Sequence, residues 1–262
     1  PERVRAVAEA AGEAGIPIRV GANSGSLPKG LLERKIASGM SREDALAESL
    51  CDAAEEQAAL LAGFGFRDVK VSLKASGAPV MVRACRLFAS RSDLPLHLGV
   101  TEAGTPYRGI VKSAAGIGSL LLDGIGDTIR VSLTAPPAEE VRAAIALLEA
   151  CELRDARPEI VSCPTCARTE YDLFSMAEKV ENLIASLKAE GVALPIRKIA
   201  VMGCVVNGPG EAKDAELGVA GSRAGSVALF RFGVPFANLP ESEAFERLKQ
   251  EILALAAETP SA

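Results

Sequence analysis

The segment DVKVSLK, residues 68–74, alternates apolar and polar side chains along its length. Side chains on a β-strand alternate between two faces, so its three aliphatic residues share one face, and Lys70, Ser72 and Lys74 share the other. Three more segments repeat this pattern: IRVGAN (18–23), LHLGVTE (96–102) and DTIRVSLT (127–134). A polar face on every strand is atypical of an open parallel sheet, which helices cover on both faces. The pattern indicates instead a barrel whose lumen opens into a polar site at the C-terminal ends of the strands.

Helical segments separate these strands, over residues 41–65, 78–91, 109–122 and 137–151. Strict alternation of strand and helix predicts an α/β fold with a parallel sheet. A TIM-type (β/α)8 barrel has eight such units, whereas the sequence contains four, preceded by a helix over 2–15. We therefore expect the C-terminal half of a TIM-type barrel, with the first half missing. Such a chain would expose two unsealed sheet edges, and we expect it to be poorly active alone.

A change in composition at RDARP, residues 154–158, predicts a linker. It divides the chain into a partial barrel over 1–153, which we expect to bind substrate, and a small α/β domain over 154–262. In this second domain we expect strands over 159–162, 196–202 and 227–232, and helices over 172–190 and 241–257.

Composition excludes several classes of protein. Of 262 residues, 48% are hydrophobic and 24% charged, which excludes wholesale disorder. The net charge of −5 and the lack of a long basic block argue against nucleic-acid binding. The sequence contains no run of about 18 apolar residues, so it predicts no membrane-spanning helix. Six cysteines are too few for a disulfide-stapled fold, so we expect a cytoplasmic protein with a metal or thiol site.

The strongest chemical signal is SCPTC (162–166) combined with GCVVNGPGE (203–211). Cys163 and Cys166 can place two thiolates on one metal centre, and Cys204 lies in a Gly- and Pro-rich loop that lets backbone amides approach a cluster. Three thiolates supply three corners of a cubane, and Glu211 would supply a fourth, more easily displaced ligand. A redox dithiol at Cys163 and Cys166 and a structural zinc site remain alternatives. The other cysteines fall in predicted helices and are expected to be buried apolar thiols: Cys51, Cys85 and Cys151.

A second signal is a set of cationic and polar residues on the strand faces: Arg19, Asn23, Lys74, Arg130 and Ser132. Positive charges that converge at a barrel mouth predict an anionic ligand, most naturally a diphosphate. Glu102, at the end of its strand, is a candidate acid or base, with a lumen salt bridge to Arg130 or Lys74 as the alternative. We expect His97, the sole histidine, to be structural rather than catalytic.

Five stretches together resemble the 4-hydroxy-3-methylbut-2-enyl diphosphate synthase family: RVGANSGS (19–26), HLGVTEAG (97–104), DGIGDTIRVSLT (123–134), SCPTC (162–166) and MGCVVNGPGE (202–211). The resemblance covers almost the whole chain, and the two cysteine motifs are specific in combination. Ala167 departs from it, because the family commonly has Gly at this position.

The resemblance implies a TIM-type barrel joined to an iron–sulfur domain of isoprenoid biosynthesis. It implies a [4Fe–4S] cluster held by Cys163, Cys166, Cys204 and Glu211. The implied substrate is 2-C-methyl-D-erythritol 2,4-cyclodiphosphate, reduced with electrons from ferredoxin or flavodoxin. The family's diphosphate-binding and lumen positions correspond to Arg19, Asn23, Lys74, Arg130 and Ser132. Its barrel glutamate corresponds to Glu102, and Asn207 matches a position that faces the substrate. Family members are homodimers in which one subunit's cluster domain closes over the other's barrel.

Overall fold

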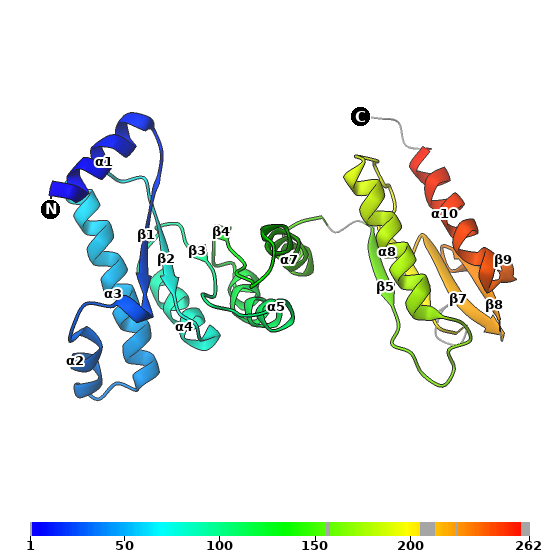
Figure 1. Ribbon diagram of the computed structural model, residues 1–262, viewed down its shortest axis with the longest axis horizontal. Helices are drawn as coiled ribbons and strands as arrows, with labels where there is room; N and C mark the ends of the chain where they lie inside the picture. Colours follow the sequence, from blue (N-terminus) through cyan, green and yellow to red (C-terminus); the bar gives the residue numbers. More distant parts are fainter. Residues whose placement is uncertain (1, 156–157, 205–212, 224, 258–262) are drawn as a thin grey trace. The chain divides into compact units, whose positions relative to one another are not determined.

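The computed structural model describes residues 2–155, 158–204, 213–223 and 225–257. The chain divides into two compact units, Pro1–Asp155 and Ala156–Ala262, and each is described by itself (Figure 1). No helix in the described part of the chain is both long enough and apolar enough to cross a lipid bilayer.

The first unit contains four parallel strands in chain order: β1 (Ile18–Asn23), β2 (Val69–Lys74), β3 (His97–Leu98) and β4 (Thr128–Ile129). Strands β1 and β2 pair along their whole length, and β3 pairs with β4 over two residues. Between β2 and β3 a parallel bridge joins Val71 and Leu96, and the Thr101 amide donates to the Ala75 carbonyl. Sequential parallel neighbours are the strand order of a TIM barrel, and the predicted α/β fold with parallel strands is confirmed.

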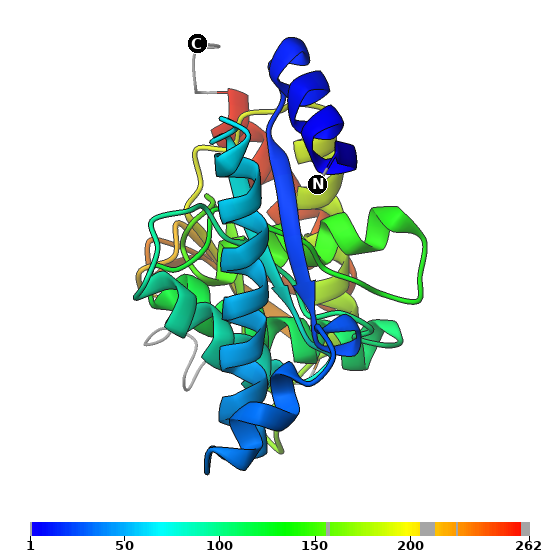
Figure 2. The ribbon, with the colours of Figure 1, turned by 90° about the vertical axis from the view of Figure 1, so that its left-hand side faces the viewer.

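Helical segments surround these strands: α1 (Glu2–Ala14), η1 (Ser24–Ser26), α2 (Leu31–Ala37), α3 (Arg42–Gly63), α4 (Ala78–Ala89), α5 (Pro106–Ser113), the π-helical η2 (Ala114–Gly118), α6 (Ser119–Leu122) and α7 (Pro137–Ala150). Helix α3 runs alongside β1 and β2 (Figure 2). It begins as its sequence predicts, because the Ser41 side chain accepts a hydrogen bond from the Asp44 amide at 3.1 Å.

The two faces of the strands have the predicted difference in polarity. Val20, Val71 and Leu98 are buried in a single core with side chains from α3, α4 and η2. The opposite face carries the polar residues of the same strands, and most of these are only partly buried. Helices therefore cover the apolar face, and the polar face of the strands is the more exposed of the two.

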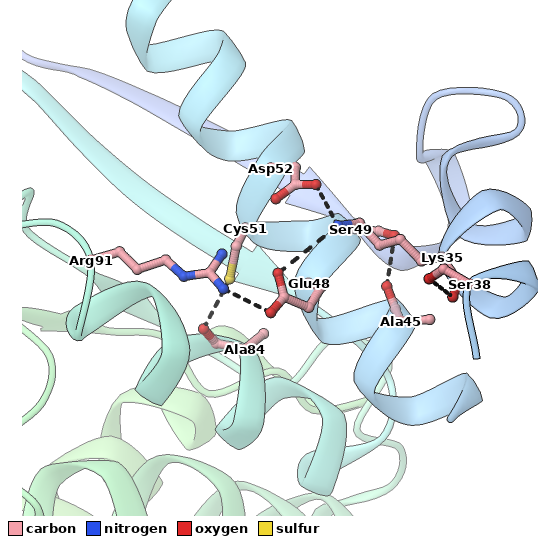
Figure 3. Close-up of polar contacts among 9 residues, drawn as sticks. All are labelled: Lys35, Ser38, Ala45, Glu48, Ser49, Cys51, Asp52, Ala84 and Arg91. Atoms are coloured by element: carbon pink, nitrogen blue, oxygen red, sulfur yellow. Dashed lines mark hydrogen bonds and ion pairs between the residues drawn. The ribbon is translucent and has the colours of Figure 1, made fainter. Parts of the chain in front are cut away.

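A polar network on the outer side of the first unit ties α2, α3 and α4 together (Figure 3). Lys35 lies 2.7 Å from Asp52, and Arg91 lies 2.7 Å from Glu48. Beside it, the buried Cys51 thiol donates to the Ala84 carbonyl at 3.3 Å. Burial raises the pKa of Cys51 to about 12, so this thiol stays neutral. Cys51 is thus a buried apolar thiol, as predicted.

The second unit is built on a five-stranded sheet in chain order: β5 (Glu159–Ser162), β6 (Lys198–Met202), β7 (Leu217–Arg223), β8 (Ser226–Arg231) and β9 (Val234–Pro240). The first three strands are parallel, and β8 and β9 are antiparallel additions. Helices α8 (Leu173–Ala189) and α10 (Glu241–Ala257) bury their apolar residues in one core with this sheet. A smaller core lies apart from these helices and includes Met202 and Phe230.

The structure corrects the expected elements of the second unit at two strands. β7 and β9 were not expected from the sequence. The sequence of β7, LGVAGSR, is rich in small residues of low strand propensity, and β9 contains Pro235 and Pro240. Proline is tolerated on β9 because this strand lies at the edge of the sheet. In the first unit, the expected strands 96–102 and 127–134 are shortened to β3 and β4.

Candidate functional site

Three of the predicted metal ligands meet in the second unit. Cys163 directly follows β5 and Cys204 lies just beyond β6, and these two strands are parallel neighbours with Ser162 opposite Val201. Carboxyl ends of neighbouring parallel strands lie at the same edge of a sheet. Cys163, Cys166 and Cys204 consequently line one pocket of about 320 Å³, although many residues separate Cys204 from the other two.

Backbone close to Cys204 holds the Cys163 sulfur in place. The Gly203 amide donates to Cys163 Sγ at 3.1 Å, and the Cys163 amide donates to the Val201 carbonyl at 3.4 Å. A Cβ atom at position 203 would lie 2.9 Å from Thr169 Oγ1, which is closer than real side chains approach. Glycine at 203 therefore leaves the space that the Thr169 side chain occupies beside this backbone.

The loop that carries Cys166 is closed by Thr169. The Cys166 amide donates to Thr169 Oγ1 at 3.1 Å, and the Thr169 amide donates back to the Cys166 carbonyl at 3.0 Å. Cys166 is exposed, and hydrogen bonds from the Arg168 backbone and then from its guanidinium hold the pKa of this thiol below its ordinary value. The thiolate is the form that binds metals, so Cys166 is prepared to act as a ligand.

The donor set of this pocket consists of three thiols. Three thiolates can supply either three corners of a four-iron cluster or three ligands of a zinc ion. Within the described residues, no three His, Cys, Asp or Glu side chains are arranged so that they could hold one metal ion. Two further predicted site residues, Asn207 and Glu211, lie outside the described residues.

The polar face of the first unit gathers four cations: Arg19, Lys70, Lys74 and Arg130. None of them forms an ion pair with any residue that the structure describes. Two glycines make room for their side chains. A Cβ at Gly21 would lie 3.3 Å from Lys74 Cε, and one at Gly99 would lie 3.4 Å from Arg130 Nε. The predicted alternative of a lumen salt bridge between Glu102 and either Lys74 or Arg130 is therefore absent from the described structure.

His97 lies among these cations. Its Nδ1 atom is 2.8 Å from Thr128 Oγ1, while His97 Nε2 and Arg130 Nε are buried without a hydrogen-bond partner among the described residues. Burial, followed by the positive charges of Arg19, Arg130, Lys70 and Lys74, lowers the pKa of His97 to about 4. The imidazole is thus neutral near pH 7, and Arg130 Nε is a buried donor without an acceptor among the described residues.

The remaining predicted residues flank this face. Asn23 ends β1 and caps η1, because its Oδ1 accepts from the Gly25 amide at 3.0 Å. Ser132 follows β4 and is half-buried. Glu102 is exposed in the turn after β3, where its φ of 53° is in the left-handed region that non-glycine residues rarely adopt. Such backbone strain is frequent at functional sites.

The sequence analysis overlooked two residues at these sites. Lys70 lies on the polar face of β2, where the alternating pattern placed it, and it is opposite the selected Arg19, yet it was not included among the predicted ligands. Tyr171 is buried in the core of the second unit and its hydroxyl has no partner within the described residues. No sequence motif marks it, because its position depends on how β7 packs against the loop after β6.

Comparisons with known proteins agree with both units. Residues 1–145 match the GcpE TIM-barrel domain, and residues 159–254 match the GcpE protein C-terminal domain. A protein of Salinispora arenicola is 48% identical over 257 residues, which cover 98% of this chain and 62% of that protein. A protein of Streptomyces griseus is 48% identical over 255 residues (97% of this chain, 63% of that protein), and one of Fusobacterium nucleatum is 50% identical over 251 residues (96% and 67%).

All three relatives carry the name 4-hydroxy-3-methylbut-2-en-1-yl diphosphate synthase (flavodoxin). The chain spans less than two thirds of the length of the first two. The two domain matches nevertheless extend over most of the chain and over both of its compact units. The chain therefore belongs to the GcpE family.

Proposed function

We propose that this protein catalyses the reductive ring opening of 2-C-methyl-D-erythritol 2,4-cyclodiphosphate to 4-hydroxy-3-methylbut-2-enyl diphosphate in isoprenoid biosynthesis. Two electrons and a proton enter, the bond between the cyclic diphosphate and carbon breaks, and a hydroxyl leaves as water. The names of the relatives and the family membership of both units support this reaction. The first unit would bind the substrate, and the second would carry the redox centre.

The observation that carries the proposal is that three cysteines from two separate loops line one pocket. We assign Cys163, Cys166 and Cys204 as ligands of a [4Fe–4S] cluster, with Glu211 as the fourth ligand. When bound, such a cluster supplies electrons one at a time, as the reduction requires. Two features of the chain would support the cluster: the Gly203 amide donates a hydrogen bond to Cys163 Sγ, and the Cys166 thiol ionises readily.

The polar face of the first unit supplies the anion site. Arg19, Lys74 and Arg130 would bind the diphosphate, since their charges are not neutralised within the described structure and charge-assisted hydrogen bonds are strong. Asn23 and Ser132 would add neutral hydrogen bonds, and Asn207 would face the substrate from the cluster loop. Glu102, exposed in its turn at the strand ends, would supply the proton for the departing hydroxyl.

We further propose an electron-carrier protein as partner, flavodoxin or ferredoxin, because the relatives' names specify flavodoxin. By resemblance to the family, the protein would work as a homodimer in the cytoplasm. Its net charge of −5 supports neither nucleic acid nor an anionic membrane surface as a partner.

Iron and sulfide analysis of anaerobically purified protein tests the cluster. We expect about four iron atoms per chain. Cys204→Ser should abolish cluster assembly, whereas the matched control Cys151→Ser, at the end of α7 in the other unit, should retain it. Glu211→Gln should impair turnover and leave part of the cluster in place. Protein that binds one zinc ion and no iron would contradict the proposal.

A redox dithiol is the second candidate function. The exposed Cys166, with its lowered pKa, is the observation that favours it, because an accessible thiolate is the attacking group in thiol–disulfide exchange. In that case Cys163 and Cys166 would titrate as a two-electron couple without iron, and Cys204→Ser would leave this couple unchanged. The same iron analysis, followed by a redox titration of the apoprotein, separates the two candidates.

A further inference from the structure

Gly21 occupies an interior position of β1 at which the backbone does not require glycine. It pairs with Ser72 of β2, and it is not among the glycines that have a positive φ. Glycine in the middle of a strand weakens that strand, because it has no side chain to pack and more freedom to lose on folding. Such a glycine often marks a place where another group approaches the backbone closely. We therefore looked for the group that fills the space beside Gly21.

The side chain of Lys74 lies in this space. A Cβ atom at position 21 would lie 3.3 Å from Lys74 Cε and 3.5 Å from Lys74 Nζ. In the register of the two strands, however, Lys74 is the partner of Asn23, the last residue of β1. The Lys74 side chain consequently folds back across the sheet, from the end of β2 toward the middle of β1. Its ammonium group lies against the polar face instead of extending beyond the strand ends.

This part of the polar face carries two further positive charges. Arg19 and Lys70 are direct partners on β1 and β2, and each lies two residues before the pair formed by Gly21 and Ser72. Like charges on neighbouring strands repel one another. None of Arg19, Lys70 and Lys74 forms an ion pair with a residue in the described part of the chain. An anion bound here would offset this repulsion.

We propose that Gly21 is a positioning residue of the anion site: its lack of a side chain lets Lys74 fold back, and so determines where the ammonium group meets a bound phosphate group. This inference rests on the proposed function, which assigns Lys74 to the diphosphate, and it adds a residue that makes no polar contact with the ligand. A lysine side chain has several rotatable bonds, so a free one loses conformational entropy when it binds. A lysine that is already held in place loses less, which strengthens binding.

A methyl group at position 21 should move the ammonium group and leave the fold intact. The three atoms nearest to the new Cβ all belong to side chains: Lys74 Cε, Lys74 Nζ and, at 3.0 Å, Ser72 Oγ. Ser72 is buried, whereas Lys74 is only partly buried and has the longer side chain, so Lys74 is the freer of the two to move. Gly99 does not allow the same test, because a Cβ there would lie 2.9 Å from the backbone carbonyl oxygen of Arg130.

Calorimetry with pyrophosphate tests the proposal on the parent chain, Gly21→Ala, Lys74→Met and the double variant. We expect the Kd to rise about threefold in Gly21→Ala and about tenfold in Lys74→Met. Because Gly21 acts through the ammonium group, the double variant should bind like Lys74→Met alone. Gly12→Ala is the matched control, since a Cβ at this position in α1 would meet no atom within 4 Å, and it should keep the parental Kd. A parental Kd in Gly21→Ala, or an undiminished effect of Gly21→Ala in the Lys74→Met background, would overturn the proposal.

A second measurement needs no ligand. In protein that contains isotope-labelled lysine, the NMR signal of Lys74 Cε is identified by its loss in Lys74→Met. It should shift in Gly21→Ala, while the lysine signals of the second unit stay in place, and an unshifted Lys74 signal would refute the positioning role. If Gly21→Ala does not fold, Gly21→Ala/Ser72→Ala removes the shortest contact and replaces it in both experiments. If the parent chain binds no pyrophosphate, the anion site of the proposed function fails, while the Lys74 signal still decides whether Gly21 positions this side chain.

Discussion

A methyl group added at position 203 should disrupt the cysteine site selectively. In Gly203→Ala the new Cβ would lie 2.9 Å from Thr169 Oγ1 and 3.3 Å from Thr169 Cγ2. Thr169 cannot move aside freely, because β-branched side chains are restricted at χ1 and its Oγ1 accepts a hydrogen bond from the Cys166 amide. The substitution should therefore displace the loop that carries Cys166.

The expected loss of stability follows from these two contacts. Overpacking of a filled site destabilises a protein by about 1–3 kcal/mol. Loss of the hydrogen bond between Cys166 and Thr169 adds about 0.5–1.5 kcal/mol. We expect the second unit to lose roughly 1.5–4.5 kcal/mol in total, and iron loading to fall with it.

Urea unfolding of the apoprotein measures this loss. The chain has no tryptophan, so in a Tyr107→Phe background the fluorescence of Tyr171 reports on the second unit alone. Gly12→Ala is the control substitution, since Gly12 lies within α1 and a Cβ there would meet no atom within 4 Å. It should leave the second unit unchanged and stabilise its own helix by about 0.5–1 kcal/mol.

The double variant Gly203→Ala/Thr169→Ala decides whether the collision is the cause. Thr169→Ala removes both atoms that the new methyl group would strike, so the two substitutions should be less destabilising together than the sum of their separate effects. Strict additivity, or a Gly203→Ala protein with the unfolding midpoint and iron content of the parent, would refute the geometric reasoning.

Four further predictions concern the first unit. His97 is the sole histidine, so its NMR signal is unambiguous; it should titrate near pH 4, and pyrophosphate should raise this midpoint by neutralising the surrounding cations. The pKa of His97 in the fold lies below its ordinary value of about 6.5, so as the pH falls His97 binds a proton in the unfolded chain before it does in the folded one. The free energy of unfolding should therefore fall between about pH 6.5 and pH 4, and His97 should cause no further loss below pH 4. Urea unfolding at a series of pH values measures this change. Arg130→Met should weaken pyrophosphate binding about tenfold or more in calorimetry, whereas Arg142→Met, which removes an exposed arginine paired with Glu139 on α7, should not. Phe88→Ala, at a fully buried core position, should lower the free energy of unfolding by about 3–5 kcal/mol, and an unchanged urea midpoint would contradict the described core.

Alternation of side chains was sufficient to predict the barrel strands and their polar face. When apolar and polar residues alternate along a strand, the apolar residues mark the buried face. Val20, Val71 and Leu98 lie on that face and are buried. The extent of pairing was harder to predict, because it depends on neighbouring strands as well as on the strand's own residues. β3 and β4 pair over two residues only, although longer stretches of sequence have strand character.

The cysteine site was predictable to a similar degree. Cys163 and Cys166 lie close in sequence, and the glycine-rich loop at Cys204 indicated a third cysteine, so the three cysteines that line the pocket were predicted to lie together. The surroundings of the site were not, since they depend on tertiary packing. Thr169 and Gly221 matter through contacts at positions 203 and 171 that no sequence pattern encodes.

The arrangement of β5, α8 and β6 also imposes an order on how this chain matures. Cys163 and Cys166 emerge during synthesis well before Cys204, and the crossover through α8 must fold back before β6 can dock beside β5. Until then the nascent polypeptide carries only two of the three thiols. The Cys204 thiol joins them once β6 pairs with β5, so the pocket that the three cysteines line forms only with this strand pair.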